Sequence, residues 1–184
     1  MKIGVYVGSF DPVHLGHLQI INYLLSSKTI DKIIVIPTGN YWNKKNLTDI
    51  KDRIDMLKLF ETESIIIDSE LFRFQYTYQI LDELRKCYSN ILFHLIIGAD
   101  NLEKFHLWKN TENILKDKII VINRNGININ SFDSKNSFIE INGLKENNIS
   151  STEIRRKIKN NEDVSKLLDI KVKDYIDNHE LYRD

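Results

Sequence analysis

The 184 residues suffice for one domain with a full hydrophobic core, and 42% apolar with 28% charged residues excludes a disordered chain. The 26 Lys and Arg residues balance the 26 Asp and Glu residues, so no overall positive charge favours nucleic acid as a partner. No apolar run approaches the roughly 18 residues of a membrane span, which argues against membrane insertion.

Short apolar runs rich in Ile and Val alternate along the chain with helical patterns. The runs cover residues 3–7, 32–37, 64–68, 91–97 and 118–122, with a sixth candidate at 137–141. Such runs are typical of strands buried in a parallel sheet, and apolar residues between them recur every three or four positions. The pattern predicts an α/β fold: a single doubly wound, Rossmann-like domain over residues 1–184, with a mostly parallel sheet of five to six strands and helices on both faces. Ligands of such sheets bind beyond the carboxyl ends of the strands.

The first strand leads into an unusual turn, because residues 8–18 read G-S-F-D-P-V-H-L-G-H-L. The first turn of a helix has N–H groups without partners and carries the positive end of the dipole, so it suits an anion. Gly8 lets the backbone turn without a Cβ atom, and Gly16 leaves room for a ligand against the helix. If the helix begins near His14, the imidazoles of His14 and His17 share one face beside this turn.

This stretch resembles the G-[ST]-F-D-x-x-H-x-G-H signature of the nucleotidyltransferase superfamily. Four further segments resemble those of the nicotinate-nucleotide adenylyltransferase family, in the family's order and over nearly the whole chain. The resemblance implies that ATP and nicotinate mononucleotide are the substrates. It assigns catalysis to His14 and His17, and ATP binding to Gly8, Ser9, Phe10 and Gly16.

The loop after the second strand, residues 37–45, reads P-T-G-N-Y-W-N-K-K. The family commonly carries P-P-H-K there, so the resemblance implies a phosphate contact for Lys44, although the prolines and the histidine are missing. Tyr41 and Trp42 fit either a lid over the ligand or packing against the domain. Arg53 matches a recurrent family arginine, and we expect it at an exposed helix position.

Two middle segments resemble the family's pyridine and ribose contacts. Residues 70–81 resemble the segment whose threonine faces the carboxylate of the pyridine ring, which implies this role for Thr77 and for the backbone near Lys109. Thr77 also stands where a helix should begin, so we expect it to cap that helix. Residues 95–108 resemble I-I-G-A-D-x-L-x-x-F-x-x-W, which places Gly98 and Asp100 at the ATP sugar and stacks Trp108 on the pyridine ring. Core packing at the edge of the sheet is the alternative for Trp108.

The C-terminal third carries two further matches. Residues 121–126 resemble a strand that leads to the family's R-x-G, with Arg124 close to the nucleotide. Residues 149–156, I-S-S-T-E-I-R-R, resemble I-S-S-T-x-I-R, and we expect one of the two serines to cap a helix. The resemblance directs Ile149, Ser150, Ser151 and Thr152 to ATP and the catalytic Arg155 to its β,γ-phosphates. The closing segment, residues 172–182, resembles the family's last helix, to which we assign a structural role.

The implied reaction joins the phosphate of nicotinate mononucleotide to the α-phosphorus of ATP and releases pyrophosphate. Positioning and charge neutralisation accelerate such transfers, so no protein nucleophile is required. Mg²⁺ would enter with ATP, mostly hydrated, and we expect no metal ligands from the protein. The single cysteine, Cys87, excludes an internal disulfide and fits a reducing compartment, and no apolar leader precedes the first strand. We therefore expect a cytoplasmic enzyme, with no indication of its oligomeric state.

Other functions compete with this interpretation. A zinc site at His14 and His17 would need a third and fourth ligand, and the other His and Cys residues are scattered. The H-L-G-H string also resembles the H-I-G-H motif of class I aminoacyl-tRNA synthetases, but the chain is too short for their further domains. A non-catalytic nucleotide sensor, nicotinamide mononucleotide as acceptor, or another acceptor such as phosphopantetheine remain the alternatives.

Overall fold

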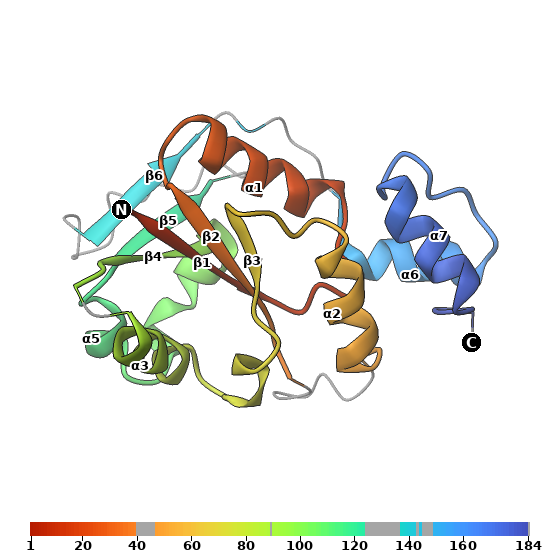
Figure 1. The fold of residues 1–184 in the computed structure, drawn as a ribbon. Coiled ribbons are helices and arrows are strands. Elements are labelled where there is room, and N and C mark those ends of the chain that lie inside the picture. The colour runs from red at the N-terminus through yellow and green to blue at the C-terminus, as the bar shows by residue number, and fades with distance from the viewer. Residues whose placement is uncertain (40–46, 89, 124–136, 143, 145–148, 184) are drawn as a thin grey trace.

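The structure of the chain is a computed structural model (Figure 1), which describes residues 1–39, 47–88, 90–123, 137–142, 144 and 149–183. Six strands form one parallel sheet in the order β3-β2-β1-β4-β5-β6. They are β1 (Ile3–Gly8), β2 (Lys32–Pro37), β3 (Ile65–Ile67), β4 (Phe93–Gly98), β5 (Lys118–Ile122) and β6 (Phe138–Ile141). The predicted α/β class and the sixth strand are confirmed. The strand order reverses between β1 and β4, so a crevice is expected where these two strands end.

Helices cover both faces of the sheet. One face carries α1 (Leu15–Ser26) and α2 (Ile50–Lys58), and α6 (Ser151–Lys159) and α7 (Ile170–Asn178) extend the same hydrophobic cluster to the side of these two helices. The other face carries α3 (Thr77–Cys87), α4 (Ala99–Glu103), α5 (Thr111–Ile114) and the 3₁₀ turns η1 (Leu71–Arg73) and η2 (Phe105–Leu107). Side chains of β2 alternate between the two faces, because successive residues of a strand point in opposite directions. Ile33 and Val35 pack under α1 and α2, whereas Ile34 and Ile36 pack under α3.

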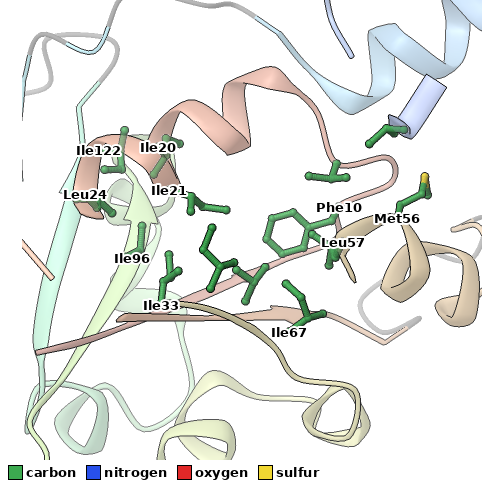
Figure 2. Close-up of a cluster of buried hydrophobic side chains, with 14 of the residues drawn as sticks. Phe10, Ile20, Ile21, Leu24, Ile33, Met56, Leu57, Ile67, Ile96 and Ile122 are labelled. Atoms are coloured by element: carbon green, nitrogen blue, oxygen red, sulfur yellow. The ribbon is translucent and has the colours of Figure 1, made fainter. Parts of the chain in front are cut away.

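The core under α1 and α2 reaches the loop that follows β1. Figure 2 shows Phe10 from this loop among Met56 and Leu57 of α2 and Ile67 of β3, with Ile20, Ile21 and Leu24 of α1 further along the same cluster. Phe10 is only 1% exposed, so the start of the β1–α1 loop is anchored in the core. The polar residues of the same loop are thereby held at the carboxyl edge of the sheet.

Helices α6 and α7 lie together beside the start of α1 and beside α2 (Figure 1). The backbone N–H of Leu15 donates to the carbonyl oxygen of Leu167, in the α6–α7 connection, at 3.0 Å. The hydroxyl of Tyr175 on α7 donates to Asp52 on α2 at 3.0 Å. The C-terminal helices are therefore attached to the segment that carries the two histidines.

Candidate active site

The carboxyl ends of β1 and β4 open into a cavity of about 1190 Å³. Helix starts from both faces of the sheet contribute to its wall, as expected for the crevice of a doubly wound sheet. Most of the predicted site residues line it: Gly8, Ser9, Phe10, His14, His17, Thr77, Gly98, Asp100, Trp108, Lys109, Ile149, Ser150, Ser151, Thr152 and Arg155. Lys44 and Arg124, and the aromatic pair Tyr41 and Trp42, lie outside the described residues.

His14 and His17 lie against each other at this cavity. His14 is the residue before the first turn of α1, and the two rings stack with centroids 3.7 Å apart and planes 25° apart. The Nδ1 atom of His17 accepts a hydrogen bond from the backbone N–H of His14 at 3.3 Å. In neutral His17 the proton is therefore on Nε2, which makes this atom a donor. The ring of Phe10 supports His17 from behind, with centroids 4.9 Å apart.

Gly16 lies against the ring of His14. Gly16 does not line the cavity, and a Cβ atom on it would lie 3.1 Å from both Cε1 and Nδ1 of His14. The space that the missing side chain leaves is therefore next to the His14 ring, and the ATP contact expected for Gly16 stays a prediction. His14 itself is only 3% exposed.

The start of α1 is also less open to an anion than the sequence suggested. The N–H of Leu15 donates to Leu167, and the N–H of His17 donates to the carbonyl of His14 at 2.9 Å. Two first-turn N–H groups thus have partners inside the protein. Anion binding at this edge depends on side-chain donors and on the loop before the helix.

Asp11, to which sequence reasoning gave no role, is completely buried within the loop between β1 and α1 (residues 9–14), which we call the histidine loop. Its Oδ1 atom accepts a hydrogen bond from the hydroxyl of Tyr182 at 2.8 Å, and its Oδ2 atom accepts one from the N–H of Thr48 at 3.4 Å. Arg155 donates from Nη1 to the backbone carbonyl of Asp11 at 2.6 Å and lies 3.7 Å from Oδ2. An acidic residue between the apolar neighbours Phe10 and Val13 was the available signal for this burial.

Arg53 is buried, so the prediction of an exposed position was wrong. Its Nη1 atom donates to the carbonyl oxygens of Ser9 at 2.8 Å and Thr38 at 2.7 Å, and Nε donates to that of Thr48 at 3.0 Å. Burial lowers the pKa of this guanidinium, and the charge of Asp11 opposes that shift. The arginine fixes the loops after β1 and β2 relative to each other.

The start of α6 delivers the last set of donors. Ser150 caps the helix, because its Oγ accepts a hydrogen bond from the N–H of Glu153 at 3.2 Å, which confirms a serine cap here. The hydroxyl of Ser151 donates to the carbonyl of Pro12 at 3.0 Å. Nη2 of Arg155 lies 3.5 Å from Oγ1 of Thr152. The I-S-S-T-E-I-R segment therefore contacts the histidine loop directly, although the two are far apart in sequence.

The other side of the cavity comes from α3, α4 and η2. Thr77 is the first residue of α3 but does not cap it: Tyr76 occupies the cap position, and its N–H donates to the side chain of Gln79 at 3.0 Å. Asp100 lies exposed in the first turn of α4. Trp108 is half-buried against Phe105, with ring centroids 5.5 Å apart, and still lines the cavity. Its ring both packs on the core and borders the ligand space.

Neither a metal site nor a membrane-spanning helix is found in the part of the chain that the structure describes. No group of three or more His, Cys, Asp and Glu side chains gathers there as metal ligands. Among the same residues, no helix combines the length and apolar character needed to cross a membrane.

Comparisons with known proteins identify relatives of the whole chain. The cytidylyltransferase-like family model matches residues 5–157. A protein of Clostridium tetani described as a probable nicotinate-nucleotide adenylyltransferase is 35% identical over 99% of this chain and 99% of its own length. One of Fusobacterium nucleatum with the same description is 37% identical over 96% of this chain and 97% of its own. The solved structure of Plasmodium falciparum nicotinic acid mononucleotide adenylyltransferase complexed with NaAD superimposes with a TM-score of 0.82, covering 98% of this chain and 97% of that chain at 24% identity, which shows the shared fold.

Proposed function

The chain belongs to the nicotinate-nucleotide adenylyltransferases within the cytidylyltransferase-like family, and we propose that it transfers the AMP moiety of ATP to nicotinate mononucleotide. The products are nicotinate adenine dinucleotide and pyrophosphate, so the reaction is a step of NAD biosynthesis. The observation that carries the proposal is the common cavity of the stacked His14 and His17, Arg155, and the Thr77 and Trp108 wall. A nucleotide sensor would not need this full set of donors.

The mechanism needs hydrogen-bond donors at the phosphate that is transferred. It does not need a nucleophilic side chain of the protein. A phosphate oxygen of the acceptor attacks the α-phosphorus of ATP, and pyrophosphate leaves in line. The Nε2–H of His17 donates to an oxygen that gains charge in the transition state, and His14 supports the imidazole of His17 by stacking. Arg155 holds the departing pyrophosphate, with the hydroxyls of Ser151 and Thr152 beside it.

The remaining ATP contacts follow from the positions of the lining residues. The backbone of Gly8, Ser9 and Phe10 borders the phosphates at the end of β1. The carboxylate of Asp100 accepts from ribose hydroxyls at the end of β4, where the missing side chain of Gly98 leaves room for this carboxylate. Ile149 and Ser150 close the ATP site at the start of α6. Lys44 and Arg124 stay predictions for phosphate and nucleotide contacts.

The acceptor's pyridine ring is proposed to bind between Trp108 and the start of α3. The flat indole face suits a planar, electron-poor ring, and the backbone N–H groups near Thr77 and Lys109 suit its carboxylate. Donors placed for a carboxylate would face the NH₂ group of a nicotinamide, which is unfavourable. This argument favours nicotinate mononucleotide over nicotinamide mononucleotide.

A divalent metal ion accompanies ATP in nucleotidyl transfer, and we propose Mg²⁺. The residues present fit a hydrated ion that would enter with ATP, because the carboxylates of Asp11 and Asp100 line the cavity but belong to no cluster of three or more ligands among the described residues. When bound, the ion neutralises charge on the phosphates. We also propose that residues 1–184 form one nucleotidyltransferase domain that works in the cytoplasm, where the single exposed thiol of Cys87 stays reduced.

Replacing His17 by alanine tests the mechanism. Loss of one donor to a charged transition state typically costs about 10²–10³-fold in turnover, so we expect His17→Ala to lose at least that much pyrophosphate release. The control is His179→Ala, because His179 stacks on Tyr175 of α7 at 4.0 Å and does not line the cavity. Near-normal turnover of His17→Ala would remove His17 from the mechanism.

A further inference from the structure

We propose that Tyr182 is a positioning residue of the active site: its hydroxyl holds Asp11, and through Asp11 it orients the histidine loop and the guanidinium of Arg155. This inference rests on the proposed function, because it concerns the same cavity. It gives the closing segment of the chain, which resembles a structural helix in sequence, a part in ATP binding and turnover.

The first step is the hydrogen bond between Tyr182 and Asp11, which joins residues 171 positions apart. The hydroxyl donates to Oδ1 at 2.8 Å, the shortest contact that the structure describes for this carboxylate. Burial and the charge of Asp11 raise the pKa of the Tyr182 phenol, so it stays protonated and remains a donor over the working pH range. Because Asp11 is completely buried, its carboxylate oxygens need such donors as hydrogen-bond partners.

The second step is the position of Arg155. Its Nη1 atom donates to the backbone carbonyl of Asp11 at 2.6 Å while lying 3.7 Å from Oδ2 of the same residue. The guanidinium thus rests on the loop and borders the cavity without closing onto the carboxylate. Without the Tyr182 hydroxyl, Oδ1 loses its donor, and the guanidinium of Arg155, 3.7 Å from Oδ2, is close enough to replace it. The expected result is a guanidinium drawn toward Asp11 and away from the phosphates.

The third step is the path by which the chain brings Tyr182 to the loop. After α7, the N–H of Leu181 donates to the carbonyl of Ile176 at 3.1 Å, and Glu180 and Tyr182 adopt positive φ angles of 51° and 63°. Left-handed conformations of non-glycine residues are uncommon and unfavourable, so a surrounding contact must maintain them. The contact between Tyr182 and Asp11 is such a contact at the end of this turn.

The chain offers a matched control for the test. Tyr175, on α7, also donates its hydroxyl to a carboxylate, that of Asp52 at 3.0 Å, and burial also raises its pKa. Tyr175→Phe removes the contacts of its hydroxyl with Asp52 and, at 3.5 Å, with Asp55, whereas Tyr182→Phe removes the one with Asp11. Both substitutions keep the ring. Only the Tyr182 variant frees a carboxylate that touches the proposed active site.

The experiment measures kcat and KM for ATP with nicotinate mononucleotide, and in parallel the affinity for ATP with Mg²⁺ by calorimetry, in the full chain. We expect kcat/KM for ATP to fall about tenfold in Tyr182→Phe, which equals about 1.4 kcal/mol, and to change less than twofold in Tyr175→Phe. Added to Asp11→Ala, which removes the acceptor of this hydrogen bond, the Tyr182→Phe substitution should have no further effect on kcat/KM. The unfolding temperatures of the two phenylalanine variants should be similar.

Two outcomes would overturn the inference: equal kinetic losses in both phenylalanine variants, which would show a purely structural role, or wild-type kinetics in Tyr182→Phe. Failure of the proposed function looks different. A wild-type chain that binds ATP but releases no pyrophosphate with any acceptor would refute adenylyl transfer. Calorimetry would then still test the inference, because ATP should bind several-fold more weakly to Tyr182→Phe than to the wild type, and Tyr175→Phe should bind ATP like the wild type.

Discussion

Replacing Gly16 by alanine should separate turnover from stability in this protein. The new Cβ atom would lie 3.1 Å from Cε1 and Nδ1 of His14, closer than ordinary contact. His14 is buried and its ring stacks on His17 at 3.7 Å, so neither ring can move alone. We therefore expect the alanine to shift both imidazoles by a few tenths of an ångström.

The expected energies predict that Gly16→Ala lowers kcat more clearly than it lowers the stability of the fold. Alanine inside a helix is favoured over glycine by about 1 kcal/mol, whereas crowding a packed region costs about 1–3 kcal/mol. The free energy of unfolding should therefore fall by no more than about 2 kcal/mol. A misplacement of 1 Å can cost about 10²-fold in rate, so a displacement of a few tenths of an ångström should lower kcat about tenfold.

The assay compares kcat from pyrophosphate release with urea unfolding for Gly16→Ala and for Ile21→Val. Ile21 lies in the buried cluster of the same helix (Figure 2), and its loss of one methylene group should cost about 0.5–1.5 kcal/mol. We expect the valine variant to keep wild-type kcat at a comparable stability. Wild-type kcat in Gly16→Ala, or an equal loss in both variants, would refute the argument that Gly16 positions His14.

Three further predictions concern other parts of the molecule. Trp108→Ala should raise KM for nicotinate mononucleotide about tenfold and leave KM for ATP unchanged, since ring stacking contributes about 1–3 kcal/mol; equal changes in both KM values would contradict the stacking role. Lysine in Arg53→Lys cannot donate to all three carbonyl groups that Arg53 binds, so the free energy of unfolding in urea should fall by about 3 kcal/mol. A decrease below about 1 kcal/mol would mean that water replaces the guanidinium. Burial lowers the pKa of His94 below 6.5 in the folded chain. As the pH falls below 6.5, His94 therefore binds a proton in the unfolded chain before it does so in the folded chain, which favours unfolding. The wild type should therefore lose more stability than His94→Leu between pH 7 and about 5.5, and parallel losses would show that His94 is not responsible.

The sheet could be predicted closely because its strands are buried on both faces. Such strands read as continuous Ile and Val runs, and the bounds expected for β2 and β5, residues 32–37 and 118–122, are those of the structure. The position of the crevice could be predicted from the same strand pattern, because the segments that resemble family motifs come directly after the ends of strands. The cap position of α3 differed by one residue, because both Tyr76 and Thr77 precede the same apolar pattern.

The contacts beneath the site could not be predicted, because they join segments without any shared local pattern. Arg53 looked like an exposed helix residue, and only the approach of the loops after β1 and β2 buries it. The hydrogen bond between Asp11 and Tyr182 spans nearly the whole chain, and neither residue signals the other in sequence. The sequence also cannot show that the His14 ring lies beside Gly16.

The most direct test of the proposed function is pyrophosphate release from ATP and Mg²⁺, with nicotinate mononucleotide and nicotinamide mononucleotide measured side by side. We expect rapid release with the acid and a rate at least tenfold lower with the amide, because the N–H groups near Thr77 and Lys109 would then face an NH₂ group. A preference for the amide would keep the fold and the histidine mechanism but contradict the assigned acceptor pocket. Absence of release with both acceptors would contradict the proposed adenylyl transfer to a pyridine mononucleotide.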